Sequence, residues 1–182
     1  MQILKTNFAG LLIIEPKVWP DSRGYFLETF KQQLLIDNGV NINWVQDNEA
    51  SSTYGVVRGL HFQKPPFAQT KLIRAVQGSI IDTVVDLRTS EPTYGLAFSL
   101  ELNDTNKLQL LIPQGFAHGY SVISPTSIVQ YKVDNVYNKN SEGGINILDK
   151  TLNINWQLPE SEMIISDKDL PLPTLAELPK IW

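Results

Sequence analysis

The stretch TKLIRAVQGSIIDTVVDLR, Thr70–Arg88, decides the fold class of this chain. It contains two apolar runs rich in Ile and Val, one on each side of Gln77-Gly78-Ser79. Short runs of β-branched residues interrupted by a glycine are typical of β-strands joined by a tight turn. We therefore expect two strands that form a hairpin, with Gly78 supplying the positive φ of the turn.

The same pattern recurs along most of the chain. Short runs rich in Val, Ile, Thr and Tyr are separated by Gly, Pro, Asn and Asp at roughly the 8 to 12 residue spacing of all-β proteins. Further examples are GLLIIEP, VVRGLHFQ, GLAFSLEL, LQLLIPQG, GYSVIS and SIVQYKV. Many strands with few helices predict an all-β sandwich or barrel.

Helices are expected in only two places. In ETFKQQLLIDNG, Phe30, Leu34 and Leu35 fall at helical spacing, and the final glycine can close the C-terminus. Thr174 and Glu177 have the spacing of a capping box, which predicts a second short helix near the end.

Length and composition restrict the class of protein. A chain of 182 residues that is 42% hydrophobic is long enough for one core, so we expect a single domain over residues 1–182. A formal net charge of −4 argues against binding to nucleic acid or to an anionic membrane. The run FAGLLII is too short to span a bilayer and lacks the features of a signal peptide, so we expect a cytoplasmic protein.

Several cofactors are also not expected. The absence of cysteine removes disulfides, thiolate nucleophiles and zinc ribbons. The sequence has no dinucleotide fingerprint and no phosphate loop, and its two histidines, His61 and His118, cannot supply a typical catalytic metal cluster. We expect no metal and no other cofactor.

The segment VVRGLHFQK, Val56–Lys64, places polar side chains in an apolar strand. A lone histidine such as His61 is more often a hydrogen-bonded core residue than a catalyst. Arg58 favours a functional interpretation, because a guanidinium rarely enters an apolar strand without an anion. In a regular strand the two would point to opposite faces, but Gly59 can host a bulge that re-aims one of them.

The other candidates are individually unremarkable. Lys71 has the position of a solvated strand-end lysine, and Tyr131 shares a face with apolar neighbours, as a core tyrosine does. His118 follows a Pro- and Gly-containing loop that enters a strand. Asp167 and Asp169, in SDKD, have the pattern of turn carboxylates.

Taken together, the motifs resemble one family over nearly the whole chain. The segments are DSRGYFLETF, QDNEASSTYGVVRGLHFQ, QTKLIRAVQGSIIDTVVDLR, PTYG, IPQGFAHGY, YKVDNVY and SDKDLPLPTL, in this order. They closely resemble the dTDP-4-dehydrorhamnose 3,5-epimerase family. The resemblance implies a metal-free cupin, which is a β jelly roll, assembled as a homodimer, with dTDP-4-dehydro-6-deoxy-D-glucose as the substrate.

The resemblance also implies roles for particular residues. His61 matches the general base and Asp169 its partner, while Lys71 matches the enolate-stabilising lysine and Tyr131 the acid on the opposite face. The positions that match contacts to the nucleotide-sugar are Arg23, Glu28, Gln46, Asn48, Arg58, His118, Glu142 and Lys168.

These residue types suit an inversion next to a ketone. A histidine with a pKa near 6.5 is an effective base at neutral pH, and an aspartate on its far nitrogen fixes the tautomer. A lysine can hold the enolate oxygen, and a protonated phenol can return a proton to the other face.

Alternatives remain open at this point. An epimerase acting only at C3 or only at C5 of a related nucleotide-sugar would use the same groups. A non-catalytic sugar-binding cupin would not need base, lysine and acid together. A metal-dependent cupin oxygenase would need a closely spaced histidine pair, which this chain lacks.

Overall fold

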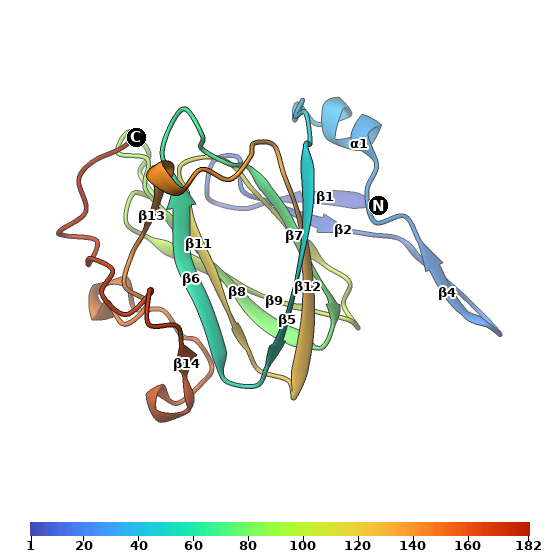
Figure 1. Ribbon diagram of the computed structural model, residues 1–182. Coiled ribbons are helices and arrows are strands. Elements are labelled where there is room, and N and C mark those ends of the chain that lie inside the picture. The colour runs from blue at the N-terminus through green and yellow to red at the C-terminus, as the bar shows by residue number, and fades with distance from the viewer.

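The computed structural model describes residues 1–182, and its centre consists of two β-sheets that face each other (Figure 1). The strand order of the first sheet is β1-β2-β10-β7-β12-β5. Its strands are β1 (Gln2–Lys5), β2 (Leu12–Glu15), β10 (Gln109–Ile112), β7 (Lys71–Gln77), β12 (Thr126–Val133) and β5 (Gln46–Thr53). All neighbours in this sheet are antiparallel.

The second sheet has the order β13-β6-β11-β8-β9, and β14 pairs with β6 in parallel. Its strands are β13 (Glu142–Gly144), β6 (Val56–Gln63), β11 (Phe116–Val122), β8 (Ser79–Asp86), β9 (Ala97–Asn103) and β14 (Ile164–Ile165). Two packed, mainly antiparallel sheets with few helices confirm the expected all-β sandwich.

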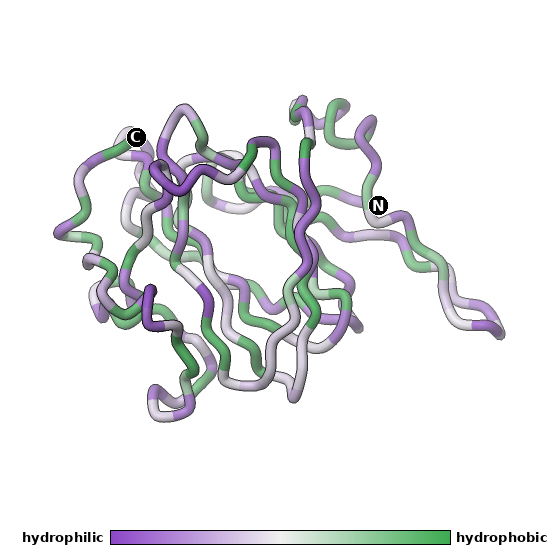
Figure 2. Tube along the Cα trace, in the orientation of Figure 1, coloured by the Kyte–Doolittle hydropathy of each residue, from purple (hydrophilic) through white to green (hydrophobic).

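The alternating sequence pattern explains how the sandwich closes. Side chains of successive strand residues point to opposite faces, so every second residue can enter the core. Figure 2 shows this alternation of hydrophobic and hydrophilic residues along several strands. The core between the sheets contains Phe8, Leu11, Ile73, Ala75, Ile80, Val84, Leu102, Leu110, Ile112, Phe116, Tyr120, Val122 and Val129.

The predicted hairpin between β7 and β8 is wrong. Gly78 has a φ of +74°, as expected of the turn residue. However, β7 pairs with β10 and β12, whereas β8 pairs with β9 and β11. The chain therefore crosses from one sheet to the other at Gly78. A tight turn leaves the direction of the second strand open, and burial against both sheets decides the pairing.

The first expected helix is confirmed and the second is shorter than expected. Helix α1 (Gln32–Asp37) ends at Asn38, and Gly39 follows with a φ of +82°. Near the end of the chain, Glu177 accepts hydrogen bonds from the Thr174 backbone N–H and hydroxyl, as in a capping box. Only a single turn follows, and the remaining helical segments are short 3-10 turns at Lys139–Ser141, Lys150–Leu152 and Glu160–Glu162.

A separate hairpin projects from the body. It consists of β3 (Val18–Asp21) and β4 (Gly24–Leu27), which pair only with each other (Figure 1). We call it the arm. Trp19 and Phe26 pack on each other in the arm but remain 39% and 66% exposed.

The C-terminal segment covers the outer face of the second sheet. Figure 1 shows it, in orange and red, running beside β6. Leu60 and Phe62 on that face pack in one cluster with Ile145, Leu152 and Trp156. This packing positions the loop after β14, which contains Asp169, at the edge of the sandwich where the pocket lies. None of the helices has the length and hydrophobicity needed to cross a membrane.

Candidate active site

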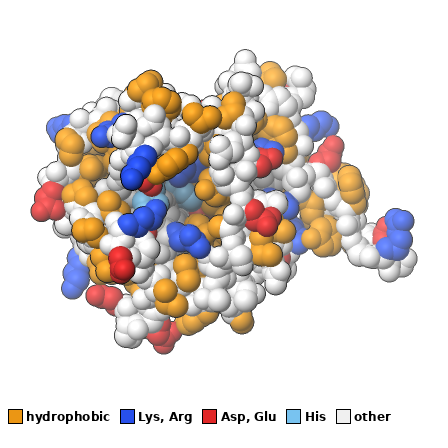
Figure 3. Space-filling view, in the orientation of Figure 1, with side chains coloured by type: hydrophobic (Ala, Val, Ile, Leu, Met, Phe, Trp, Pro, Cys, Tyr) orange, Lys and Arg blue, Asp and Glu red, His pale blue; other side chains and the backbone are white.

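A pocket of about 560 Å³ opens at the edge of the sandwich, between the two sheets. Figure 3 shows histidine side chains at the bottom of this hollow and Lys and Arg side chains around it. The polar and aromatic residues that line it include Gln46, Asn48, Arg58, His61, Gln69, Lys71, His118, Tyr120, Tyr131, Tyr137, Glu142, Ser166, Lys168 and Asp169. Ten of the twelve predicted site residues are therefore in one place.

A bulge in β6 brings Arg58 and His61 to the same face. In the pairing of β6 with β11, His61 lies opposite His118 and Arg58 lies opposite Tyr120. Three steps along β6 therefore match two steps along β11. Gly59, in the extra step, has a φ of +124°. The bulge anticipated at Gly59 is confirmed, and it explains why both side chains reach the pocket.

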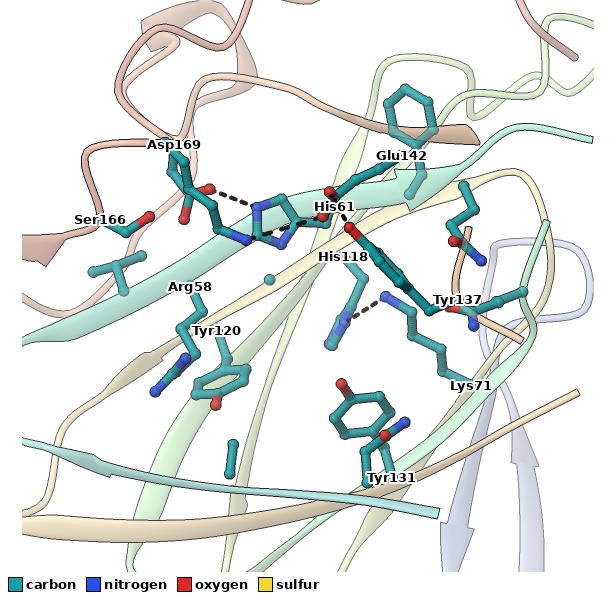
Figure 4. A pocket seen from close by; sticks show the side chains of 18 of the residues that line it. Arg58, His61, Lys71, His118, Tyr120, Tyr131, Tyr137, Glu142, Ser166 and Asp169 are labelled. Carbon is teal, nitrogen blue, oxygen red and sulfur yellow. Dashed lines mark hydrogen bonds and ion pairs between the residues drawn. The ribbon is translucent and has the colours of Figure 1, made fainter. Parts of the chain in front are cut away.

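His61 forms a hydrogen-bonded pair with Asp169. Its Nε2 lies 2.7 Å from Oδ1 of Asp169, and the Asp169 side chain is only 4% exposed (Figure 4). A buried carboxylate on Nε2 selects the tautomer with the proton on that nitrogen. Nδ1 is then the basic nitrogen of His61.

Lys71, itself half-buried, belongs to a second group of interacting side chains. Its Nζ lies 3.4 Å from Nδ1 of His118, and Nε2 of His118 lies 2.7 Å from Oδ1 of the buried Asp82. Burial lowers the pKa of His118, and burial also lowers the pKa of Lys71 to about 8. A neutral His118 that donates to Asp82 leaves Nδ1 as the acceptor for the lysine ammonium. This arrangement holds the ammonium at the pocket.

The expectation for His118 needs correction in one respect. We expected it in a loop entering a strand, but it lies within β11 and is 6% exposed. The strand begins at Phe116, because the residues after Gly115 pair directly with β8. His118 still lines the pocket, beside Lys71 rather than in an exposed loop.

Tyr131 lies across the pocket from His61. It comes from β12 in the first sheet, whereas His61 comes from β6 in the second (Figure 4). Its ring packs against the core, as expected of a tyrosine on that face, and burial raises the pKa of its hydroxyl. The phenol therefore remains protonated at neutral pH.

Four further predicted residues also line the pocket. Gln46 donates a hydrogen bond to Asn48 across 2.7 Å on β5. Glu142 accepts a hydrogen bond of 2.8 Å from the Tyr137 hydroxyl and lies 4.0 Å from the Lys168 ammonium. These side chains place polar groups on opposite sides of the pocket, with both signs of charge at Glu142 and Lys168.

Arg23 and Glu28 are the two predicted residues that this chain does not bring to its own pocket. Arg23 lies in the turn of the arm, pairs with Asp21, and its side chain is 87% exposed. Glu28 is also exposed, just beyond the end of β4. Neither residue lines the pocket.

Sequence reasoning missed Asp82, Tyr120 and Tyr137. Asp82 had a usable signal, because it lies in SIIDTVVD on the same strand face as Ile80 and Val84. A carboxylate is rarely found on an apolar strand face unless it has a partner. Tyr137 lies in a loop whose contact with Glu142 depends on the folded chain, so it had no comparable signal.

The ionisable side chains do not form a metal centre. No group of three or more His, Asp or Glu residues is placed to hold a metal ion. The two histidines are instead each paired with one aspartate. The arrangement offers a base, a cation and a protonated phenol around one cavity, which are the groups needed to move a proton between two faces of a carbon.

The β-sandwich and this pocket define the class of the protein as a cupin-type isomerase. The family model described as dTDP-4-dehydrorhamnose 3,5-epimerase matches residues 5–177. The chain belongs to the dTDP-4-dehydrorhamnose 3,5-epimerase family.

Individual relatives agree with this assignment. The chain is 46% identical over 171 residues to the dTDP-4-dehydrorhamnose 3,5-epimerase of Shigella flexneri, covering 93% of each chain. A crystal structure of the enzyme of that name from Elizabethkingia anophelis superposes with a TM-score of 0.93 at 44% identity, covering 100% of this chain and 99% of that one. The dTDP-6-deoxy-D-glucose-3,5-epimerase of Legionella pneumophila, in complex with dTDP-4-keto-L-rhamnose, also has a TM-score of 0.93, at 38% identity over 98% of this chain and 94% of that one.

Proposed function

We propose that this chain inverts C3 and C5 of dTDP-4-dehydro-6-deoxy-D-glucose and so forms dTDP-4-dehydro-L-rhamnose. The observation that carries this proposal is the placement of His61 and Tyr131 on opposite sheets across one pocket. A flat enolate held between them has one face toward the base and the other toward the acid. Protonation from the second face inverts the carbon.

His61 is the base in this proposal. Its Nδ1 removes the proton from the carbon next to the C4 ketone, and the Asp169 carboxylate stabilises the imidazolium that results. The electron pair of the broken C–H bond passes to the C4 oxygen. The pair of 2.7 Å between His61 and Asp169 supports this role because it orients the ring.

Lys71 stabilises the negative charge of the enolate oxygen. Its ammonium lies at the pocket beside His118, where burial strengthens its interaction with a developing oxyanion. Asp82 acts through His118 to hold this geometry. The reaction as proposed uses only side chains, with no metal or other cofactor.

Tyr131 returns a proton to the face opposite His61. Its hydroxyl gives its proton to the enolate carbon, the C–H bond re-forms with inverted configuration, and the C4 ketone is restored. The phenolate left behind then takes a proton from solvent, and the His61 imidazolium releases the proton that it took to solvent. The same cycle serves C3 and C5, because both carbons adjoin the C4 ketone.

Polar and cationic side chains around the pocket hold the diphosphate and thymidine. Arg58 and Lys168 are cations that line it and suit phosphate oxygens. Gln46 and Asn48 on β5, with Glu142 opposite, offer polar contacts to the rest of the nucleotide-sugar. Binding energy from these remote groups orients the sugar for proton transfer.

We propose a homodimer in which the arm completes the partner's pocket. The arm exposes Trp19, Tyr25 and Phe26, an apolar surface that its own protomer leaves uncovered. Arg23 in the arm turn and Glu28 beside it do not line the pocket of their own chain. Exchange of arms between two copies would bury the aromatic rings and bring both residues to a nucleotide site.

The same proposal includes one domain over residues 1–182 and a location in the cytoplasm. The two sheets share a single core between them, which supports one domain. The net charge of −4 supports a protein that does not bind nucleic acid or an anionic membrane.

Solvent exchange in D2O tests the two-face mechanism. His61→Ala should lose both inversion and deuterium uptake, because no proton leaves the carbon. Tyr131→Phe should lose inverted product yet retain deuterium incorporation with the original configuration, because His61 can return a solvent-derived proton to the face from which it came. The readout is NMR of the sugar carbons.

The same spectra of the wild-type enzyme separate the alternatives. Deuterium at C3 and C5 with inversion at both supports the proposal, whereas deuterium at one carbon identifies a C3-only or C5-only epimerase. No exchange at either carbon would leave a sugar-binding protein without catalysis. If Tyr131→Phe inverted at the wild-type rate, Tyr131 would not be the acid.

A further inference from the structure

Tyr120 is a buried pocket residue that the mechanism above does not use. It lies in β11, its ring lines the pocket, and the residue is 5% exposed. Its hydroxyl has no hydrogen-bond partner in the protein. The nearby Ser52 hydroxyl accepts a hydrogen bond of 3.1 Å from Nε of Arg58 instead.

An unpartnered buried hydroxyl lowers the stability of a folded protein. Such groups are rare in native structures, because the hydroxyl loses water without gaining a replacement. A phenylalanine ring would fill the same space without this cost. We therefore expect the hydroxyl of Tyr120 to gain a hydrogen-bond partner when a ligand binds.

Its position indicates which part of a ligand would meet it. Tyr120 lies directly opposite Arg58 in the strand pairing, on the same sheet as His61, and Figure 4 shows its ring between Arg58 and Tyr131. It therefore lies between the proposed phosphate-binding arginine and the proposed acid. In the substrate, C2 and its hydroxyl lie between the reacting C3 and the anomeric carbon that carries the diphosphate.

We propose that Tyr120 is a specificity-determining residue whose hydroxyl donates a hydrogen bond to the oxygen on C2 of the sugar. This inference rests on the proposed function. Arg58 is exposed and is drawn toward the diphosphate when the nucleotide-sugar binds, which opens the hydroxyl of Tyr120 to the sugar. The contact favours sugars that carry an oxygen at C2 over 2-deoxy sugars.

The protonation state of Tyr120 suits a donor. Burial raises the pKa of its hydroxyl, and the positive charge of Arg58 and the nearby Ser52 hydroxyl oppose this only in part. The group therefore carries its proton at neutral pH. An oxygen on C2 can accept that proton in a hydrogen bond, whereas a methylene at C2 cannot.

The test is a cycle of two changes, Tyr120→Phe in the protein and removal of the C2 hydroxyl from the substrate. With the natural substrate, Tyr120→Phe should lower kcat/KM roughly three- to tenfold. With the 2-deoxy substrate, wild type and Tyr120→Phe should have equal kcat/KM. The melting temperature of Tyr120→Phe should equal or exceed that of wild type, and its affinity for dTDP should be unchanged.

Three results would overturn the proposal. A lower melting temperature would mean that the hydroxyl already has a partner in the free protein. If Tyr120→Phe lost kcat/KM equally on both substrates, the hydroxyl would contact a group other than the C2 oxygen. If it also lost affinity for dTDP, the contact would be with the diphosphate. Unchanged kcat/KM on the natural substrate would remove any role.

Two controls keep this test separate from the proposed function. Tyr94→Phe removes the hydroxyl of a tyrosine outside the pocket and should behave as wild type on both substrates. Turnover of the natural substrate by wild type tests the proposed function independently. If wild type turns over and Tyr120→Phe matches it, only the inference about Tyr120 fails.

Discussion

Asp167 and Asp169 are two positions apart in the segment SDKD, yet they lie in different surroundings. Asp169 is 3% exposed and paired with His61, whereas Asp167 is exposed to solvent. We expect Asp169→Asn to reduce kcat by about a hundredfold or more, because the amide neither fixes the tautomer nor stabilises the imidazolium. Asp167→Asn should stay within about twofold of wild type. Steady-state kinetics of both variants decide this, and the reverse order would contradict the assignment.

Lys71 predicts how the reaction depends on pH. Burial lowers its pKa from 10.5 to about 8, so the ammonium that holds the enolate is lost as the pH rises through about 8. The rate should fall over that range. Lys71→Met should reduce kcat by about 10²- to 10³-fold, and its residual activity should lack this decrease. A wild-type rate that stays constant to pH 10 would contradict the role of the ammonium.

The lowered pKa of Lys71 also affects the stability of the folded protein, where the charged ammonium is unfavourable. A lysine whose pKa is lower in the folded state binds its proton more weakly there, so the charged form costs stability below about pH 8, and the cost disappears toward pH 10.5. Lys71→Met should therefore raise the free energy of unfolding at pH 7 by about 1 to 3 kcal/mol. Urea unfolding measures this, and a destabilised variant would mean that the ammonium is well stabilised by Asp82.

At the scale of single elements, the bulge in β6 sets the geometry of the site. A Cβ on Gly59 would lie 2.5 Å from the Gly119 Cα and 2.8 Å from the His118 carbonyl oxygen, at a φ of +124°. Gly59→Ala should lower the free energy of unfolding by about 3 kcal/mol or more, because backbone of β11 has to move. It should also abolish activity, because Arg58 and His61 would no longer share a face.

Gly39→Ala is the matched control for this change. Gly39 also has a positive φ, +82°, but a Cβ there would meet nothing within 4 Å. It should cost only about 1 kcal/mol and leave kcat unchanged. Chemical denaturation compares the two variants. If both variants lost the same free energy of unfolding, the positive φ alone would explain the loss. The close approach of β6 and β11 would then not contribute.

At the scale of the whole molecule, exchange of the arm predicts complementation between inactive variants. Arg23→Ala should impair nucleotide binding, and His61→Ala should abolish catalysis. If Arg23 serves the partner's pocket, a mixed dimer contains one intact site and one doubly altered site. Co-refolding equal amounts should restore about one quarter of wild-type activity, since about half of the dimers are mixed.

The control for this experiment is a pair of variants in the same pocket. Mixing His61→Ala with Lys71→Met should restore nothing, because both residues belong to the pocket of their own chain. Light scattering establishes the assembly state. A fully active monomer, or no complementation by Arg23→Ala, would end the proposal of an exchanged arm.

Local sequence patterns by themselves predicted the strands in the apolar runs, the first helix and Gly59 as a place that can host a bulge, whereas the arm strands β3 and β4 and the polar strand β5 were not predicted. These features depend on short-range physics, namely the alternation of side chains, the φ range of glycine and helical spacing. The motifs determined the family, and ten of the twelve predicted site residues line one pocket.

The tertiary structure alone decided which strands pair and which residues meet. The turn at Gly78 was predictable, but the separation of β7 and β8 into different sheets depends on burial against strands far along the chain. Likewise, His61 and Asp169 are 108 residues apart, and Asp82 reaches His118 only because β8 and β11 are neighbours. Spacing along a chain predicts local conformation, whereas contacts between distant segments arise only when the whole core is packed.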